Sequence, residues 1–435
     1  MDMLNKYFPI RERNSTVRRE VIGGVTTFLT MSYIIFLHPN MLAETGMDKQ
    51  ALITITCLAA FFGTILFGLW VNVPFAMAPG LGLNSYFTYT ICLGMGVDWQ
   101  TALGIVFISG VMFVLLTAFG VREKIVDSIP ITLRLAVPAG IGLLITFIGL
   151  KNIGLVVPNE ATFITLGNLT PTVIIGLTGL ILTAVLEIKK IPGSILIGMA
   201  VSVILALAFG FISLPDTFIS TPPSPAPVSM HLNITGALKI GFIGVIFSFL
   251  YVALFDSVGT LLACSYEAGL ADKDGKIKRI GRMLGSDAIA TMVGAVMGTS
   301  TVTAYIESAS GISAGARTGL ASVITALLFL LAPLFAPLIS IVPGYATAPA
   351  LIVVGVYMFK TITKIDFSDF LDGFPAFITI ILMPFTNSIS TGLTFGFLSF
   401  IILYLVTGRG ARISKVMWVI GILSTLNLIS GGLHV

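Results

Sequence analysis

Long apolar segments alternate with short polar stretches from Val21 almost to the end of the chain. Most of these segments come close to the roughly 20 residues that a helix needs to cross the hydrocarbon core of a bilayer. The pattern therefore predicts an all-α polytopic membrane protein. Fourteen spans are expected, at residues 21–42, 51–71, 74–93, 99–121, 130–150, 171–187, 192–212, 240–263, 283–298, 299–317, 319–342, 345–360, 373–386 and 390–407.

Two of these segments are interrupted in a way that predicts broken helices. Residues 299–305 are rich in Thr, Ser, Val and Tyr, which favour an extended backbone, and a glycine-spaced helical stretch with Glu307 in its first turn follows. In the first half of the chain, the proline-bounded stretch 73–79 precedes a short helix that contains Asn84 in the same way. Short extended stretches are thus expected before half-helices in spans 3 and 10. Irregular backbone at membrane depth must be buried in protein or line a cavity.

The chain divides into two halves of seven spans. The connection at residues 213–235 contains Pro222, Pro223, Pro225 and Pro227 and no lysine. Seven is an odd number, so the second half would be inverted relative to the first. Broken helices at matching positions of two inverted halves indicate a binding site near the membrane midplane of a secondary transporter. The apolar run 416–429 is short and is expected to lie at the membrane interface.

Composition excludes an ordinary soluble protein. Hydrophobic residues make up 56% of the chain and charged residues only 10%, whereas about 25% charged residues is usual for soluble domains. The three cysteines lie inside apolar segments, and the histidines lie near span ends or in loops. These positions predict no disulfide framework, no metal site and no cofactor.

Charge sets the expected orientation of the spans. Five basic residues precede the first span, which places the N-terminus in the cytoplasm by the positive-inside rule. With fourteen spans, both termini and nearly all other Lys and Arg residues fall on that side, the exceptions being Lys49, Lys151 and Lys239. The net charge of +4 follows from this sidedness, so nucleic acid is not an expected partner.

Asp256 and Glu307 are carboxylates inside apolar segments. A charged residue at the bilayer centre costs about 2.5–3.5 kcal/mol even on the lower scales, so both are candidates for substrate binding and proton coupling. Tyr33 is a further candidate, since its ring or hydroxyl could contact the substrate. Thr30 either contributes to the site or bonds back to its own helix, and Phe255 either stacks on a planar substrate or packs. The sequence shows no catalytic pair of a nucleophile with a general base, such as Ser with Lys or His, so an enzyme is not expected.

Several motifs in order resemble one family. They are residues 26–31 (TTFLTM), 78–84 (APGLGLN), 255–261 (FDSVGTL) and 301–319. In combination they are similar to the AzgA-like purine permeases of the nucleobase-cation symporter-2 group. The resemblance implies import of hypoxanthine, guanine or adenine by proton symport across the bacterial cytoplasmic membrane. It implies that Asp256 and Glu307 bind the base and couple to the proton and that Asn84 supports the site, with Ser257 and Thr301 among the substrate-binding residues.

The same resemblance implies a domain organisation. A core domain would contain residues 1–125 (spans 1–4) and 236–342 (spans 8–11). A gate domain would contain residues 126–235 (spans 5–7) and 343–435 (spans 12–14 and the tail). The core would move against the gate to give alternating access. A homodimer is the candidate assembly.

The chemistry of the candidate residues is compatible with a purine. A purine is a neutral plate with N–H donors, which carboxylates accept, and with ring nitrogens, to which backbone amides donate. An anion transporter of the same architecture, for example of the sulfate type, is the alternative. Such a transporter would be expected to have an Arg or Lys near the half-helices, where this sequence offers only carboxylates. Sodium is the alternative to the proton as the coupling ion.

Overall fold

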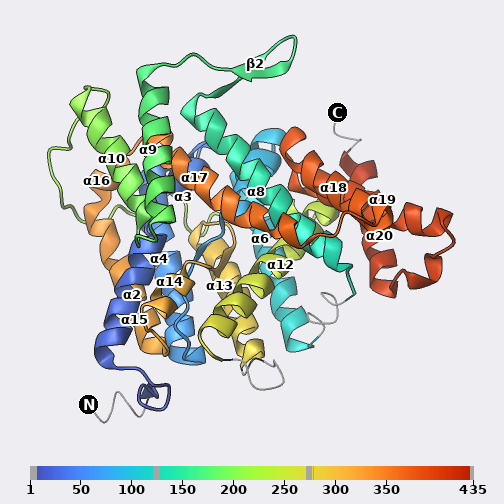
Figure 1. Cartoon of the computed structure of the whole chain (residues 1–435), viewed down its shortest axis with the longest axis horizontal. Coiled ribbons are helices and arrows are strands. Elements are labelled where there is room, and N and C mark those ends of the chain that lie inside the picture. The colour runs from blue at the N-terminus through green and yellow to red at the C-terminus, as the bar shows by residue number, and fades with distance from the viewer. Residues whose placement is uncertain (1–6, 121–127, 271–276, 278, 432–435) are drawn as a thin grey trace.

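The computed structural model describes residues 7–120, 128–270, 277 and 279–431 (Figure 1). Parts of two predicted basic loops, at 121–127 and 271–276, lie outside these described residues. The α-helices are α2 (Val17–Met31), α3 (Ile34–Ala43), α4 (Lys49–Leu66), α5 (Leu81–Ser85), α6 (Trp99–Ala118), α8 (Ile131–Ile153), α9 (Pro171–Ile188), α10 (Ser194–Ala208), α11 (Ile234–Ala237), α12 (Ile243–Glu267), α13 (Ile280–Met297), α14 (Ser308–Ser313), α15 (Gly319–Leu331), α16 (Ala336–Ser340), α17 (Gly344–Phe359), α18 (Phe370–Phe385), α19 (Ile389–Val406) and α20 (Lys415–Gly431).

Shorter elements interrupt or connect these helices. The π-helical turns are η1 (Phe67–Val71) and η2 (Tyr86–Gly94), and the 3-10 turns are η3 (Ile240–Phe242), η4 (Ala332–Phe335), η5 (Lys360–Lys364) and η6 (Gly410–Arg412). The strands are β1 (Met77–Pro79), β2 (Val156–Asn159), β3 (Phe163–Leu166) and β4 (Val302–Ala304).

The expectation of a mostly helical membrane protein is confirmed. Within the described residues, ten helical segments are long and apolar enough to cross a membrane. Each of the other predicted spans also contains helix, but in shorter pieces. The third and tenth predicted spans each consist of a strand followed by short helical pieces. These helical pieces are too short to be counted among the ten. The total of fourteen spans therefore stays a prediction.

Both predicted extended stretches are present, and they pair with each other. Strands β1 and β4 form an antiparallel ladder in which Ala78 lies opposite Thr303. Pro74 and Pro79 disfavour a continuous helix here because proline lacks the backbone N–H. The ladder satisfies backbone groups that are fully buried, as a non-helical segment requires at membrane depth. The opposite strand directions are those that inverted repeats require.

The glycines of the second broken segment permit close packing. A Cβ on Gly311 of α14 would lie 2.5 Å from the carbonyl oxygen of Gly23 in α2, and one on Gly319 would lie 2.1 Å from that of Gly68. Gly315, between them, ends the helical stretch with a φ of +107°. Gly311 and Gly319 therefore lie at close helix contacts, but the expected glycine-spaced helical stretch is wrong in extent, because the chain leaves the helical conformation at Gly315 and the three glycines do not share one helical face.

The N-terminus of α15 is capped by residues far away in the sequence. Buried Glu20 accepts hydrogen bonds from the backbone N–H groups of Arg317 (3.0 Å) and Thr318 (3.2 Å). Asn72 Oδ1 accepts from the N–H of Gly319 at 2.9 Å. Helix N-termini leave such donors without partners inside the helix, and these contacts hold the break between α14 and α15 in place.

The helices pack in two sets. In one set, α8 packs against α17 and α18, and α9 packs against α10 and α17. In the other set, α2 packs against α14 and α15, and α13 packs against α6. Helices α18, α19 and α20 lie at one end of the long axis, and α2, α10 and α15 lie toward the other (Figure 1). The division into core and gate domains stays a prediction.

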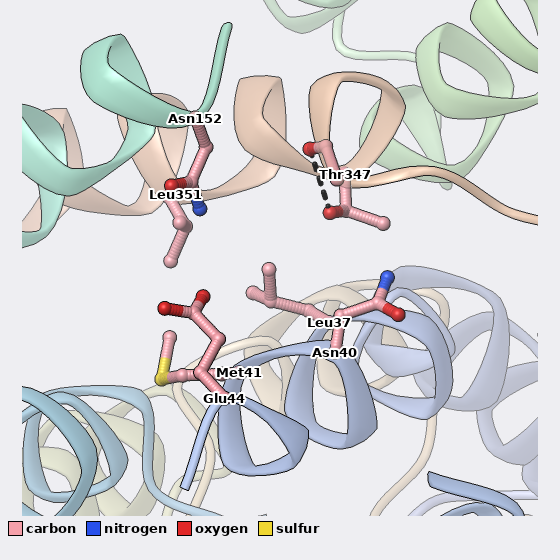
Figure 2. A pocket seen from close by; sticks show the side chains of 8 residues that line it. Leu37, Asn40, Met41, Glu44, Asn152, Thr347 and Leu351 are labelled. Carbon is pink, nitrogen blue, oxygen red and sulfur yellow. Dashed lines mark hydrogen bonds between the residues drawn. The ribbon is translucent and has the colours of Figure 1, made fainter. Parts of the chain in front are cut away.

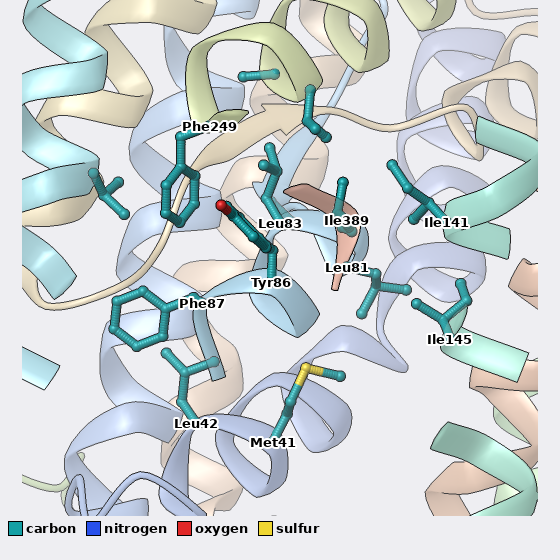
Figure 3. Packing of buried hydrophobic residues seen from close by; sticks show 14 of the residues in the cluster. Met41, Leu42, Leu81, Leu83, Tyr86, Phe87, Ile141, Ile145, Phe249 and Ile389 are labelled. Atoms are coloured by element: carbon teal, nitrogen blue, oxygen red, sulfur yellow. The ribbon is translucent and has the colours of Figure 1, made fainter. Parts of the chain in front are cut away.

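The half-helix α5 lies where the two sets meet. Leu81 and Leu83 of α5 lie in one apolar cluster with Ile141 of α8, Phe249 of α12 and Ile389 of α19 (Figure 3). The cluster fixes the first broken segment by burying its side chains against helices from both halves of the chain.

The structure adds detail to two segments outside the predicted spans, at residues 156–166 and 415–431. Strands β2 and β3 form a hairpin with the pair Asn159 and Phe163 at its tip, which the sequence pattern did not reveal. The run 416–429 is part of helix α20, which packs on α19 and α12. Its interfacial location and the cytoplasmic C-terminus stay predictions.

Replacing Gly311 with Val should destabilise the protein because the new side chain would meet Thr27 Oγ1 and the Gly23 carbonyl oxygen. We expect the free energy of unfolding to fall by about 1–3 kcal/mol, the usual cost of overpacking. The measurement is the midpoint of thermal unfolding in detergent, which should be lower than in the wild type. Gly281→Ala is the matched control, because a Cβ there would meet nothing within 4 Å. Equal midpoints for the two variants would contradict the packing role.

Candidate functional site

A cavity of about 550 Å³ lies beside both broken segments. One wall consists of the start of α5 (Gly80 to Gly82), the stretch from Thr303 to Glu307, and α12 around Asp256. The opposite wall consists of α8 and α17, together with Lys364 at the end of η5. The cavity therefore lies between the two sets of helices, where the broken segments present their helix N-termini.

Glu307 follows the last residue of strand β4 by three positions and occupies the N-cap position of α14. Its carboxylate lines the cavity and accepts a hydrogen bond of 2.6 Å from the hydroxyl of Tyr33. Tyr33 is buried at the interruption between α2 and α3, and its ring also lines the cavity. The two predicted site residues thus form one hydrogen-bonded pair.

Asp256 lines the same cavity from the middle of α12. A Cβ built on Gly80 would lie 3.7 Å from Asp256 Oδ2 and 2.8 Å from the methyl group of Thr303. Glycine at the N-cap of α5 is therefore required, because any side chain would collide with Thr303. The Asp256 carboxylate faces the positive end of this half-helix, an arrangement that stabilises negative charge.

Asp287 is a buried carboxylate that the sequence analysis did not select. It lies in α13 and accepts a 2.5 Å hydrogen bond from the hydroxyl of Ser257, which is also 3.2 Å from Thr303 Oγ1. Ser257 and Asp287 thus connect α12, α13 and β4 behind Asp256. The signal was present, because Asp287 falls inside the predicted span 283–298 and carries the same membrane cost as the other two carboxylates.

The remaining candidates lie behind the cavity or away from it. Asn84 is buried in α5, where its Oδ1 accepts a hydrogen bond from Ser300, and it is absent from the described cavity lining. Thr301 is buried beside Gly80, with its Oγ1 3.7 Å from the Cβ position of that glycine. Thr30 donates to the carbonyl groups of its own helix, as the alternative reading expected. The side chain of Phe255 lies outside the described residues.

Basic residues line the cavity as well, contrary to the expectation that this region offers only carboxylates. Arg134 in the first turn of α8 and Lys364 at the end of η5 belong to the wall opposite the half-helices. From sequence position alone, Arg134 and Lys364 were expected only at cytoplasmic span ends or in cytoplasmic loops. The packing of α8 and α17 across the cavity brings these ends to its border.

A smaller cavity of about 270 Å³ lies between α3 and the facing helices α8 and α17. Glu44 points toward Asn152 and Leu351 across this space (Figure 2). The Glu44 carboxylate accepts a hydrogen bond of 2.8 Å from Tyr89.

Comparison with known proteins gives consistent matches over nearly the whole chain. A model described as "Permease family" (Xan_ur_permease) matches residues 18–395. The putative permease MJ0326 of Methanocaldococcus jannaschii is 45% identical over 99% of both chains. The adenine permease AdeP of Escherichia coli is 42% identical, over 98% of this chain and 96% of AdeP. The guanine/hypoxanthine permease PbuG of Bacillus subtilis is 41% identical, over 95% of this chain and 97% of PbuG.

Solved structures with a similar fold are more distant in sequence. The transmembrane domain of the cyanobacterial bicarbonate transporter BicA superposes with a TM-score of 0.65 at 14% identity, over 86% of this chain and 97% of that one. The murine anion transporter Slc26a9, in its inward-facing state, gives a TM-score of 0.64 at 13% identity, over 94% of this chain and 72% of that one. These matches establish the fold only.

Replacing Ser257 with Ala should destabilise the region behind Asp256. The variant removes the hydroxyl that donates to Asp287 and leaves a buried carboxylate oxygen without this donor. We expect the free energy of unfolding to fall by about 1–3 kcal/mol, measured by thermal unfolding in detergent. Ser399→Ala, which removes only a hydroxyl bonded to its own helix, is the control. A variant as stable as the control would show that the Ser257–Asp287 contact is dispensable.

Proposed function

Since this chain belongs to the permease family whose model matches residues 18–395, we propose that it imports purine nucleobases as a secondary active transporter. The observation that carries the proposal is the pair of carboxylates, Asp256 and Glu307, beside two half-helix N-termini in one cavity. Relatives over 40% identical along nearly their full length are named as adenine and guanine/hypoxanthine permeases.

The cavity provides the groups that a purine would require. A volume of about 550 Å³ lies within the roughly 300–1,000 Å³ typical of small-molecule sites. Asp256 and Glu307 would accept from ring and exocyclic N–H groups, and backbone N–H groups at the start of α5 would donate to ring nitrogens. Because Tyr33 holds Glu307 through one carboxylate oxygen, the other oxygen is left for the base. Asn84 and Thr301 would support this arrangement from behind, through the buried segment that precedes β4.

An anion transporter is the second candidate, and one observation favours it. Arg134 and Lys364 line the cavity, as basic residues would in a site for an anion. The fold is also compatible with this candidate, since a bicarbonate transporter and an anion transporter share it. However, the half-helix wall carries two carboxylates, which would repel an anion bound at the helix N-termini. The names of the close relatives also favour a nucleobase.

Alternating access is the expected mechanism. The cavity extends from Glu307 to Arg134 and Lys364, which mark the cytoplasmic side by the positive-inside rule. The conformation is therefore inward-open in this proposal. The helices around α2, α14 and α15 would move as one core against α8, α9 and α17, because close glycine contacts hold the core helices together.

Protonation of Glu307 is proposed to couple the proton gradient to transport. A charged carboxylate that crosses the gate without a partner would cost several kcal/mol. The neutral acid avoids this cost and still forms hydrogen bonds to Tyr33 and the base. Binding of substrate and proton together would then permit the core to move.

Replacing Asp256 or Glu307 with Ala should each abolish purine uptake, because each removes an acceptor for the base. Uptake of radiolabelled hypoxanthine by cells that express the variants is the measurement, with membrane abundance determined by immunoblot. Glu160→Gln, an exposed carboxylate outside the cavity lining, is the control and should transport normally. Wild-type uptake by either alanine variant would remove that residue from the proposed site. Competition by unlabelled adenine, guanine, xanthine, uracil and sulfate would separate the purine function from the anion alternative.

Replacing Glu307 with Gln should separate binding from coupling. Gln keeps the shape and a hydrogen-bonding oxygen but cannot carry the transported proton. In proteoliposomes with an imposed inward proton gradient, the variant should lose accumulation while it retains exchange of purine for purine. The same experiment with and without sodium tests the coupling ion in the wild type. Uptake that follows sodium and ignores the proton gradient would contradict proton coupling and leave the purine assignment intact.

A further inference from the structure

The smaller cavity, of about 270 Å³, has a polar lining that the proposed site does not use. Asn40 of α3 and Glu44 at the end of that helix form one side. Asn152 of α8 and Thr347 of α17 form the other side. The Glu44 side chain is exposed, and buried Tyr89 donates to its carboxylate. The cavity therefore presents an anchored, water-accessible carboxylate opposite an amide (Figure 2).

One face of α17 lines both the smaller and the larger cavity. Thr347 and Leu351 belong to the lining of the smaller cavity. Val354, Met358 and Thr361 belong to the lining of the larger one. Consecutive members of this series are three or four residues apart, which is the spacing of one helical face. Helix α17 therefore runs along both cavities with the same side.

Helix α8 connects the two cavities in the same way. Ile141 lines the larger cavity and Asn152 lines the smaller one. Ile145 and Ile148 continue the same face between them and are buried. At 1.5 Å per residue, the distance from Ile141 to Asn152 along the helix is about 16 Å. The two cavities thus lie one after the other on a single path between the helix sets.

An apolar constriction separates the cavities on this path. Met41 lines the smaller cavity and Leu81 lines the larger one. Both belong with Ile145 to one buried apolar cluster (Figure 3). The hydroxyl of Ser85 lies 3.8 Å from Met41 Sδ, so α5 and α3 are in contact here. A polar solute would lose its hydrogen bonds to water in this constriction without gaining others, which is costly.

The smaller cavity lies at the outer end of the path in the proposed orientation. Arg134 is in the first turn of α8 and Asn152 is in its last turn. Thr347 is near the start of α17, and Lys364 follows the end of that helix. Since Arg134 and Lys364 mark the cytoplasmic side, Asn152 and Thr347 mark the outer side.

We propose that the smaller cavity is an entry subsite, at which a purine base from outside binds before it passes the constriction to Asp256 and Glu307. This inference rests on the proposed purine import. The volume of about 270 Å³ is just below the roughly 300 Å³ at which typical small-molecule sites begin. It therefore suits a single flat base better than a nucleoside.

Glu44 and Asn152 are the residues that would bind the base. Asn40 already donates to the carbonyl oxygen of Val342 at 3.3 Å, and the hydroxyl of Thr347 donates to its own helix. The Glu44 carboxylate has acceptor capacity beyond the bond from Tyr89, and it would accept from a ring N–H. The Asn152 amide would both donate and accept, as amides do along the edge of a purine. The same carboxylate would repel an anion, so the subsite would also favour a neutral base.

The test measures equilibrium binding of radiolabelled hypoxanthine to the full-length protein in detergent. The variant Asp256→Ala/Glu307→Ala lacks the carboxylates of the central site and should retain weak, saturable binding at the entry subsite. Addition of Glu44→Gln should weaken this binding about tenfold or more. The Gln oxygen can keep the bond from Tyr89, whereas its amide group presents a donor to the base. Glu160→Gln, an exposed carboxylate outside both cavity linings, is the matched control and should change nothing.

A second measurement uses proteins with an intact central site. Glu44→Gln and Asn152→Leu should each raise the KM for hypoxanthine uptake about tenfold, because the base is captured less often. The maximal rate should stay near that of the wild type, since neither residue contacts the base in the central cavity. A purely structural role would lower the maximal rate or the amount of protein in the membrane instead.

The outcomes separate this inference from the function on which it rests. A wild-type protein that neither binds nor transports hypoxanthine would overturn the proposed function, and the subsite with it. If the wild type binds the base, then a folded Asp256→Ala/Glu307→Ala variant without residual binding would overturn the subsite alone. Residual binding that is unchanged by Glu44→Gln would do the same. If that double variant does not fold, a wild-type KM in both Glu44→Gln and Asn152→Leu would overturn the subsite.

Discussion

The antiparallel pairing of β1 with β4 is the constraint on which the rest of the structure depends. Backbone groups at membrane depth have no water to bond, so two interrupted helices can persist there only if they satisfy each other. Their pairing brings the N-termini of α5 and α14 to one cavity from opposite directions. It also connects residues more than 200 positions apart in the sequence. The cavity beside the strand pair can offer polar groups to a substrate because the fold already buries polar backbone groups there.

The contacts around the strand pair explain why so many small residues are found nearby. Gly80 leaves space for Thr303 and Asp256, and Gly311 permits α14 to approach α2. Buried Glu20 and Asn72 cap the helix that follows the second break. Each contact joins segments that are distant in sequence, so the broken helices are held as one rigid unit.

Charge is distributed unevenly around the cavity. The half-helix wall carries Asp256 and Glu307, with Asp287 buried behind it, and the opposite wall carries Arg134 and Lys364. The helix N-termini offset the negative charge on the first wall. The structure therefore separates the carboxylate-bearing wall, which we propose binds the purine, from a border of basic residues. This separation favours a neutral substrate with N–H donors at the half-helices.

The sequence by itself determined the membrane class, the segments that form helices, both broken helices and the two cavity carboxylates. These features are local: chain length and hydropathy define a span, proline and β-branched residues interrupt it, and a carboxylate in an apolar segment is costly wherever it points. Only the tertiary structure decided which polar side chains meet. It paired Tyr33 with Glu307, placed Asn84 behind the cavity rather than in its lining, and brought Arg134 and Lys364 to the border. The physical reason is that such meetings depend on how each helix is rotated and placed against its neighbours, and contacts between distant segments fix that rotation.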